Sequence, residues 1–266
     1  MGRIALGVGY DGREWSGWQT QPDGRTVQDQ LEAALSAFID QPVSTICAGR
    51  TDAGVHALGQ VVHVDSPVHR NEAAWVRGVN SFLPESIAVQ WAHEVSDDFH
   101  ARFSATSRSY TYVISNTPVR QPLLAGHTGW CFRPLDEDCM HQGAQLLLGE
   151  HDFSSFRSSQ CQAASPIRTI DHASVERRAH LVLIHLRANA FLHHMVRNIV
   201  GELVLLGTGK TDLAHFKRTL EAKDRTQAAA TFSAAGLYLT RVVYPDELLP
   251  RQPVLASPLF SCLEIC

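Results

Sequence analysis

A short polar segment, residues 48–57, holds the side chains of this sequence that could do chemistry. It reads Ala-Gly-Arg-Thr-Asp-Ala-Gly-Val-His-Ala and places a guanidinium, Arg50, two residues before a carboxylate, Asp52. Gly49 and Gly54 permit the positive φ angles and close backbone approach of a sharp loop. Held on such a loop, Asp52 could share one pocket with Arg50, because side chains two residues apart can point to the same side. The same spacing fits an Asx-turn in which Asp52 caps its own backbone, so spacing alone leaves both interpretations open.

Two apolar runs must position this segment. Residues 42–47 read as a short strand, and residues 59–65 are rich in β-branched side chains. The polar segment is therefore predicted to be a loop between two strands.

The first half of the chain follows a recognisable order of elements. Alternating apolar residues predict a strand over residues 3–10, and Thr26 is the expected N-cap of a helix that ends near Ile39. Asn71 caps a second predicted helix that ends before Pro84, and residues 87–94 return as a strand. Strand, helix, strand, strand, helix, strand is close to a ferredoxin-like half.

The second half of the chain has a similar but less regular order of predicted strands and helices. It has predicted strands over residues 109–116, 169–176, 180–188 and 237–244, predicted helices over residues 136–148, 190–206 and 211–222, and an irregular connection over residues 118–133. We therefore expect an N-terminal α+β half over residues 1–104, a C-terminal α+β half over residues 105–246, and an extension over residues 247–266.

Charge is gathered in parts of the chain, although the net charge is −4. Between Asp98 and Asp136 there are four arginines, Arg102, Arg108, Arg120 and Arg133, and no acid; from residue 153 to residue 201 six arginines face two acids. Phosphate neutralisation supplies most of the affinity of a protein for nucleic acid, so these spans are candidate nucleic-acid contacts. Codon bias in a GC-rich genome would explain the excess of arginine over lysine equally well.

Several classes of site are not expected. Six cysteines are scattered without a Cys-x-x-Cys pair, which predicts reduced thiols and no zinc. Residues 207–211 end like a phosphate-binding loop but lack its first glycine and follow a predicted helix. His193 and His194 are adjacent on a predicted helix, which would point them about 100° apart and prevent shared metal ligation. No apolar run suits a membrane span or a signal peptide, so we expect a cytoplasmic protein.

Further motifs accompany the polar segment in a fixed order. They are Tyr10-Asp11-Gly12, residues 15–21 (Trp-Ser-Gly-Trp-Gln-Thr-Gln), residues 26–28 (Thr-Val-Gln), residues 99–105 (Phe-His-Ala-Arg-Phe-Ser-Ala), residues 108–112 (Arg-Ser-Tyr-Thr-Tyr), residues 152–156 (Asp-Phe-Ser-Ser-Phe), residues 189–198 (Asn-Ala-Phe-Leu-His-His-Met-Val-Arg-Asn) and residues 236–239 (Gly-Leu-Tyr-Leu). Together with the Gly-Arg-Thr-Asp-Ala-Gly-Val-His-Ala segment, this series resembles the tRNA pseudouridine synthase A family from about Ile4 to about Pro245. The number and order of the motifs make the resemblance specific.

The resemblance implies a fold and a reaction. The fold is α+β, with two ferredoxin-like halves joined through a continuous mixed, mainly antiparallel sheet and a central cleft. The reaction isomerises uridine to pseudouridine at positions 38, 39 and 40 in the anticodon stem-loop of tRNA, with no cofactor and no metal. The implied partners are tRNA and a second copy of the chain in a homodimer.

The resemblance also implies the site residues. Asp52 is the catalytic carboxylate, acting either as a nucleophile on the ribose C1′ or as the base that removes the C2′ proton. Tyr110 matches a tyrosine that stacks on the target base, Arg197 matches a cation beside the carboxylate, and Arg50 matches an arginine that contacts the flipped nucleotide. Arg102 is a further expected substrate-binding residue.

Two other interpretations use the same residues. A catalytically idle RNA-binding module on the same fold would bind tRNA without turnover, which the presence of Asp52, Tyr110 and Arg197 disfavours. An acid–base hydrolase would use Asp52 together with a second placed carboxylate, and the polar segment offers none. The residues Trp15 and Trp18 fit either a core position or stacking on RNA.

Overall fold

The computed structural model describes residues 2–249 of the chain, and these divide into two compact units. The first unit contains residues up to Ser107 and the returning segment from Tyr238, and the second contains Arg108–Leu237. The division at residues 104 and 246 stays a prediction, and the predicted extension lies almost wholly outside the described residues.

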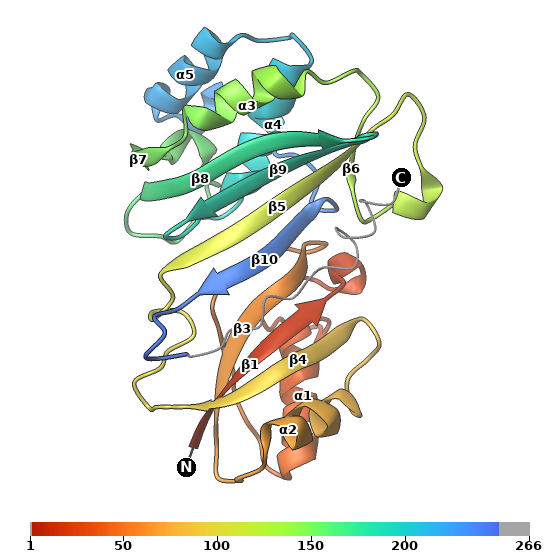
Figure 1. The fold of residues 1–266 in the computed structure, drawn as a ribbon, viewed down its shortest axis with the longest axis vertical. Helices are drawn as coiled ribbons and strands as arrows, with labels where there is room; N and C mark the ends of the chain where they lie inside the picture. Colours follow the sequence, from red (N-terminus) through yellow and green to blue (C-terminus); the bar gives the residue numbers. More distant parts are fainter. Residues whose placement is uncertain (1, 250–266) are drawn as a thin grey trace. The chain divides into compact units, whose positions relative to one another are not determined.

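The first unit is a mainly antiparallel sheet with two helices (Figure 1). Strand β1 (Gly2–Tyr10) pairs antiparallel with β3 (His56–Ser66) and with β4 (Ile87–Val95). Strand β10 (Leu237–Val243) pairs parallel with the start of β3, and the short β2 (Ile46–Cys47) pairs antiparallel with it. Leu6, Val8 and Val62 are inaccessible to solvent, which places the middle of the sheet in the core of this unit.

The helices of this unit begin at the predicted caps. Thr26 accepts the amide N–H of Asp29 at the start of α1 (Val27–Ile39), and Asn71 accepts that of Ala74 at the start of α2 (Glu72–Asn80). Each cap satisfies an amide that the helix itself leaves without a partner. Phe38 of α1 meets Trp75 of α2 edge to face, with 5.2 Å between ring centroids, so the two helices share one apolar seam.

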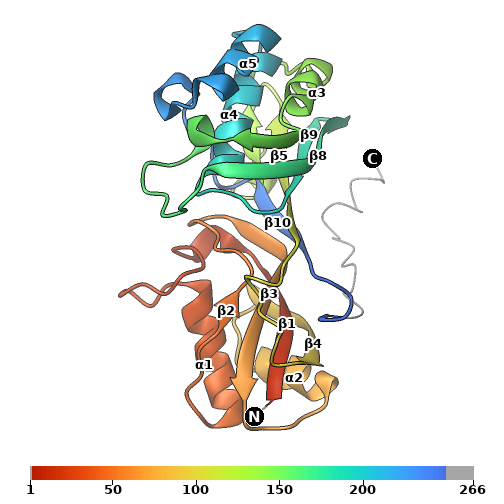
Figure 2. The same ribbon diagram turned by 90° about the vertical axis from the view of Figure 1, so that its left-hand side faces the viewer.

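The second unit contains β-strands and three helices. Strand β5 (Ser107–Asn116) pairs antiparallel with β9 (Leu181–Ala188) and parallel with β6 (Gly129–Cys131), while β8 (Ile167–Arg178) pairs antiparallel with β9 and with β7 (Gly149–Asp152). Figure 2 shows α3 (Glu137–Gln145), α4 (Met195–Gly207) and α5 (Leu213–Ala222) gathered on one side of these strands. Met140, Ile199 and Phe216, one from each helix, are fully buried.

Four short 3-10 helices complete the description of both units. They cover Gly12–Glu14, Pro122–Leu124, Ser154–Phe156 and Arg225–Gln227. The prediction of an α+β fold with mainly antiparallel pairing is confirmed. Within residues 2–249 no helix combines the length and apolar character needed to cross a membrane. A continuous sheet through both halves and a central cleft stay predictions.

The predicted start of helix α4 was wrong. The pattern of apolar residues favours helix from residue 190, but α4 begins at Met195, and His194 before it has a left-handed φ of 63°. His193 and His194 therefore precede the helix, and their ring centroids lie 4.0 Å apart. Helical geometry therefore does not separate these two rings.

Candidate active site

Asp52 lies in a tight turn between β2 and β3, as the sequence predicts. The amide of Val55 donates to the carbonyl of Asp52 at 3.1 Å, which closes a four-residue turn. Gly54, the third residue of this turn, has a φ of 77°, the left-handed value that a type II turn requires at this position. The Asp52 side chain is half-buried. The backbone therefore holds the carboxylate on a fixed support with partial access to solvent.

The residue before Asp52 is fixed by the loop that carries both tryptophans. The amide of Trp18 donates to the carbonyl of Thr51 at 3.0 Å, and the hydroxyls of Tyr10 and Thr51 lie 2.8 Å apart. Gly17 has a φ of 98°, and a Cβ there would lie 2.8 Å from the Thr51 carbonyl oxygen, so only glycine fits. Trp18 is 1% exposed and belongs to the core, whereas Trp15 is half-buried.

The start of the polar segment is fixed by a buried side-chain amide that the motifs did not indicate. Gln60, on β3, is fully buried; its Nε2 donates to the Gly49 carbonyl at 2.6 Å, and its Oε1 accepts the Gly49 amide at 3.4 Å. Next to it, the amide of Ala48 donates to the carbonyl of Val61 at 2.8 Å. A glutamine within a run of β-branched residues was the available signal, because a buried amide must find partners.

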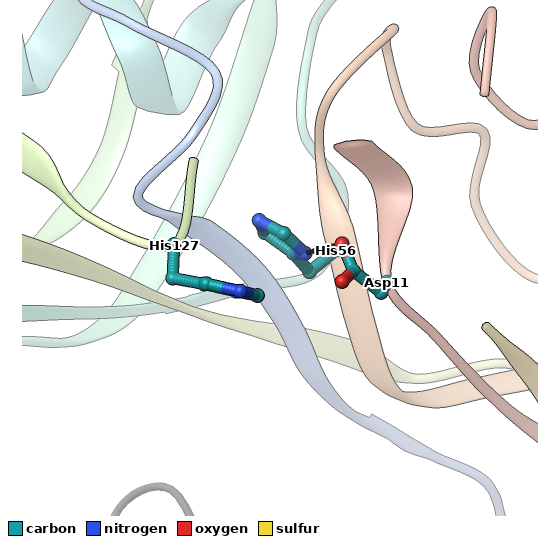
Figure 3. A group of neighbouring side chains, drawn as sticks. All are labelled: Asp11, His56 and His127. Carbon is teal, nitrogen blue, oxygen red and sulfur yellow. Dashed lines mark ion pairs between the residues drawn. The ribbon is translucent and has the colours of Figure 1, made fainter. Parts of the chain in front are cut away.

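The residues after the turn are held by a polar pair, Asp11 and His56, which face each other in Figure 3. Asp11 Oδ1 lies 3.2 Å from His56 Nδ1, and Arg13 donates from both Nε and Nη2 to the Asp11 carboxylate. Burial opposes ionisation of Asp11, but the hydrogen bonds from Arg13 and the charges of His56 and Arg13 hold its pKa below the usual value.

The ring of His56 stacks on Tyr238 of β10, with centroids 4.6 Å apart and planes 17° from parallel. Burial, together with the nearby charge of Asp11, raises the pKa of Tyr238 well above its ordinary value. The Tyr238 hydroxyl is therefore neutral at physiological pH. The start of β3 is consequently fixed on two sides, by the Asp11 carboxylate and by the Tyr238 ring.

Arg50 and Arg102 are both exposed, and both influence the thiol of the half-buried Cys47. Burial raises the pKa of Cys47 to about 11, against the opposing charges of Arg50 and Arg102. The positive charges of Arg50 and Arg102 thus oppose the effect of burial on this thiol. The structure thus brings these two predicted substrate-binding residues to one part of the first unit.

Tyr110 and Arg197 belong to the second unit. Tyr110 is on β5, is 9% exposed, and meets Phe191 edge to face with 5.1 Å between centroids. Arg197 lies in the first turn of α4, and its Nε donates to the carbonyl of Phe232 at 2.9 Å. The amide of Phe232 donates back to the carbonyl of Arg197 at 3.2 Å, so the side chain is anchored at its Nε end.

The five predicted site residues therefore divide between the units. Arg50, Asp52 and Arg102 belong to the first unit, and Tyr110 and Arg197 to the second. Within the first unit, a carboxylate on a rigid turn has two arginines in the same unit. A carboxylate can act as a nucleophile or as a base, and guanidiniums bind phosphate oxygens, so the residue types of the first unit suit chemistry on an anionic substrate.

Comparison with known proteins identifies the family. The family model described as tRNA pseudouridine synthase matches residues 8–104 and 144–245, which include Asp52, Arg50, Arg102 and Arg197 but not Tyr110. The chain belongs to the tRNA pseudouridine synthase family. Members of this family are isomerases that convert uridine in tRNA to pseudouridine.

Curated relatives match over nearly the whole chain. The tRNA pseudouridine synthase A of Bordetella petrii is 58% identical and the match covers 93% of each chain. That of Bordetella parapertussis is 56% identical over 99% of this chain and 100% of the relative, and that of Janthinobacterium sp. (strain Marseille) is 57% identical over 95% and 96%. A crystal structure of an archaeal box H/ACA sRNP Nop10-Cbf5 complex is also similar, with a TM-score of 0.35 and 14% identity over 88% of this chain and 47% of that one. The family assignment does not rest on that structure.

Proposed function

We propose that this chain carries out the reaction of its family at uridines 38, 39 and 40 of the tRNA anticodon stem-loop, with Asp52 as the catalytic carboxylate. The observation that supports this assignment is the position of Asp52. It lies inside the family match, on a turn that hydrogen bonds fix before, within and after the carboxylate. A catalytic group must be held within a fraction of an ångström of its working position, and such a turn provides that support.

The proposed reaction is an isomerisation that balances without a co-reactant. The bond between ribose C1′ and uracil N1 breaks, the base turns over while bound, and a bond from C1′ to C5 forms. The hydrogen of C5 leaves as a proton, and N1 gains one. Asp52 serves either as the nucleophile on C1′ or as the base at C2′ during detachment. The isomerisation involves no net oxidation or reduction, so no redox cofactor is needed.

The remaining site residues are proposed to bind the substrate. Tyr110 stacks on the target base, Arg197 supplies positive charge for the carboxylate chemistry, and Arg50 and Arg102 contact the RNA. Arginine suits these tasks because its planar fork binds phosphate and carboxylate oxygens in pairs. The two exposed arginines of the first unit, together with the half-buried Asp52, support this assignment.

We further propose that the enzyme works in the cytoplasm as a homodimer. Two copies would combine the positive spans of two chains on one tRNA, which would reconcile RNA binding with a net charge of −4 per chain. Sedimentation equilibrium at working concentration tests the dimer. A single species with the mass of one chain would overturn it.

Release of tritium from uridine labelled at C5 tests the proposed function. Purified chain without added cofactor is expected to release tritium from unmodified tRNA, and Asp52→Asn is expected to stop release while tRNA affinity stays within a few-fold. The exposed Asp138 on α3 provides a matched control, because Asp138→Asn removes one carboxylate elsewhere. Release by Asp52→Asn at the wild-type rate would overturn the assignment, and binding without release by the wild type would indicate an idle RNA-binding module.

A further inference from the structure

An exposed aromatic ring near the end of the N-terminal half of the chain has no part in the proposed chemistry. Phe103 is 75% exposed, in the turn after β4. A single exposed apolar side chain is ordinary on a protein surface. What distinguishes Phe103 is the rigidity of the backbone that carries it.

Side chains hold four consecutive amides in this turn. The amide of His100 donates to Ser104 Oγ at 3.0 Å, and that of Ala101 donates to His63 Nδ1 at 3.1 Å. The amides of Arg102 and Phe103 both donate to His100 Nδ1, at 3.2 and 3.1 Å. Nδ1 of His100 is therefore an acceptor in this structure. Because these hydrogen bonds order the turn during folding, the entropy of ordering it is not lost again on binding.

The same turn is anchored in the core of the first unit. The hydroxyl of Tyr244 donates to the carbonyl of Ala101 at 2.6 Å, and Ala101 is fully buried. Phe99, also fully buried, packs on Tyr244 with 4.9 Å between centroids. The two side chains that follow, Arg102 and Phe103, are consequently directed to solvent from a fixed base.

The ring of Phe103 is supported on its inner side and accompanied by a cation. It lies nearly parallel to His100, with centroids 4.4 Å apart and planes 28° from parallel. The guanidinium carbon of Arg102 lies 5.5 Å from the centroid of the Phe103 ring. A flat, rigid, partly exposed ring beside a guanidinium matches the two parts of a nucleotide, because bases stack on aromatic rings and arginine binds phosphate.

Other groups extend this surface. Ile46 of β2 is 41% exposed and pairs with His63, the residue that holds the Ala101 amide. Arg50 and Arg102 both act on the neighbouring Cys47 thiol. Phe103 therefore lies beside Arg102 and is connected through His63 to β2, the strand that precedes the Asp52 turn.

We propose that Phe103 is a stacking platform for an unpaired base of the RNA, with Arg102 bound to an adjacent phosphate. The inference rests on the proposed function for the identity of the RNA, and it adds a subsite apart from the target uridine. The proposed ligand is single-stranded RNA, because neighbouring bases cover the faces of each base inside a duplex. A protein partner on this ring is the competing occupant, and the experiment separates the two.

The test measures RNA affinity by fluorescence anisotropy at one fixed salt concentration. The probes are an anticodon-arm hairpin that contains no uridine and a blunt duplex of the same number of nucleotides. The variants are Phe103→Leu and Phe103→Gln, which remove the ring, and Phe103→Trp, which keeps one. Phe82→Leu is the matched control, because Phe82 is another exposed phenylalanine of the first unit, 55% exposed.

Loss of the ring is expected to weaken hairpin binding by about 5- to 150-fold, which corresponds to the usual stacking contribution of one base. Phe103→Trp and Phe82→Leu should stay within about two-fold of wild type, and duplex binding should be alike for all variants. Equal effects of Phe103→Leu and Phe82→Leu would overturn the proposal. So would an equal loss for hairpin and duplex, or a loss that accompanies dissociation of a dimer in sedimentation.

The hairpin makes this result independent of catalysis, because it offers no uridine to isomerise. A ring-dependent loss of hairpin affinity in a chain that releases no tritium from tRNA would overturn the proposed function alone. Tritium release with ring-independent binding would overturn the Phe103 subsite alone.

Discussion

Arg197 is held in a way that makes arginine and lysine unequal at this position. Its Nε is bound to the Phe232 carbonyl, which fixes the plane of the guanidinium, and lysine has no equivalent of Nε. Arg197→Lys is therefore expected to keep the positive charge but to lose its fixed orientation. Misplacement of a catalytic group can lower the rate about a hundredfold. Single-turnover rates on one tRNA should fall far more than tRNA affinity.

Arg225→Lys is the matched control for Arg197→Lys. Arg225 donates to Asn198 Oδ1 at 3.1 Å and to the carbonyl of Ala228 at 3.1 Å, so it supports the same segment of the second unit. A purely structural loss would lower the turnover of both variants alike. If Arg197→Lys runs at the rate of Arg225→Lys or of wild type, Arg197 has no special part in the chemistry.

Tyr110 can be tested through its ring and its hydroxyl separately. The side chain is 9% exposed and packs edge to face on Phe191, an arrangement that fits either a core residue or a surface for base stacking. Tyr110→Phe should bind tRNA normally, whereas Tyr110→Leu should lose about 1 to 3 kcal/mol of binding free energy. Equal affinity of the two variants for tRNA would make Tyr110 a core residue.

At the scale of elements, His63 connects strand β3 to the turn that carries Arg102 and Phe103. Burial, together with the charges of Arg3 and His100, lowers the pKa of His63 to about 4, below the ordinary value near 6.5. Neutral His63 accepts the Ala101 amide, and protonation removes that acceptor. The unfolded chain therefore binds this proton at a higher pH than the folded chain does.

Because the unfolded chain binds this proton at a higher pH, a fall in pH favours the unfolded state. The stabilisation is complete above about pH 6.5 and is lost as the pH falls toward 4, by about 2 kcal/mol between pH 7 and pH 5. Urea unfolding across this range should show a steeper loss for wild type than for His63→Asn, whose amide oxygen can accept without titrating. Parallel curves for the two proteins would show that His63 contributes nothing to the pH dependence.

Elements with a local signal were predictable from the sequence. Thr26, Asn71 and Asp136 each accept an amide three residues later at a helix start, as the capping patterns predict. The hairpin of β8 and β9 and the turn at Asp52 followed from alternation and from paired glycines. In these cases the residues that specify the structure are neighbours in the chain.

Elements set by distant partners were not predictable. The strands β6 and β7 have three and four residues, and their pairing with β5 and β8 defines them rather than their own composition. The segment before α4 has a helical pattern, but the side chain of Asn189 accepts the amides of Thr169 and Ala190 instead. Gln60 was missed for the same reason, because its partner Gly49 is brought to it only by the fold.

Across the whole molecule, the structure leaves fewer arginines available for phosphate contact than the sequence suggested. Of the four arginines between residues 98 and 136, Arg108 is buried and donates to the Asn189 carbonyl at 2.9 Å. In the later span, Arg177, Arg178 and Arg187 pair with Glu137, Glu176 and Asp171. The exposed arginines Arg102, Arg120 and Arg133 stay candidates for phosphate contact, together with Arg50.

This distribution predicts a salt dependence that the net charge of −4 would not suggest. About four phosphate contacts should lower tRNA affinity roughly 50-fold between 50 and 200 mM salt, because each contact releases condensed counterions. Arg120→Gln and Arg133→Gln should each reduce the slope of log affinity against log salt by about one. Arg218→Gln, which removes an exposed arginine on α5 outside these spans, should leave that slope unchanged.

Anisotropy titrations at four salt concentrations measure the slope for wild type and for each of the three variants. Equal affinity at low and moderate salt would show that phosphate contacts do not dominate tRNA binding. An equal reduction of the slope by Arg218→Gln and Arg120→Gln would show that Arg120 has no specific phosphate contact.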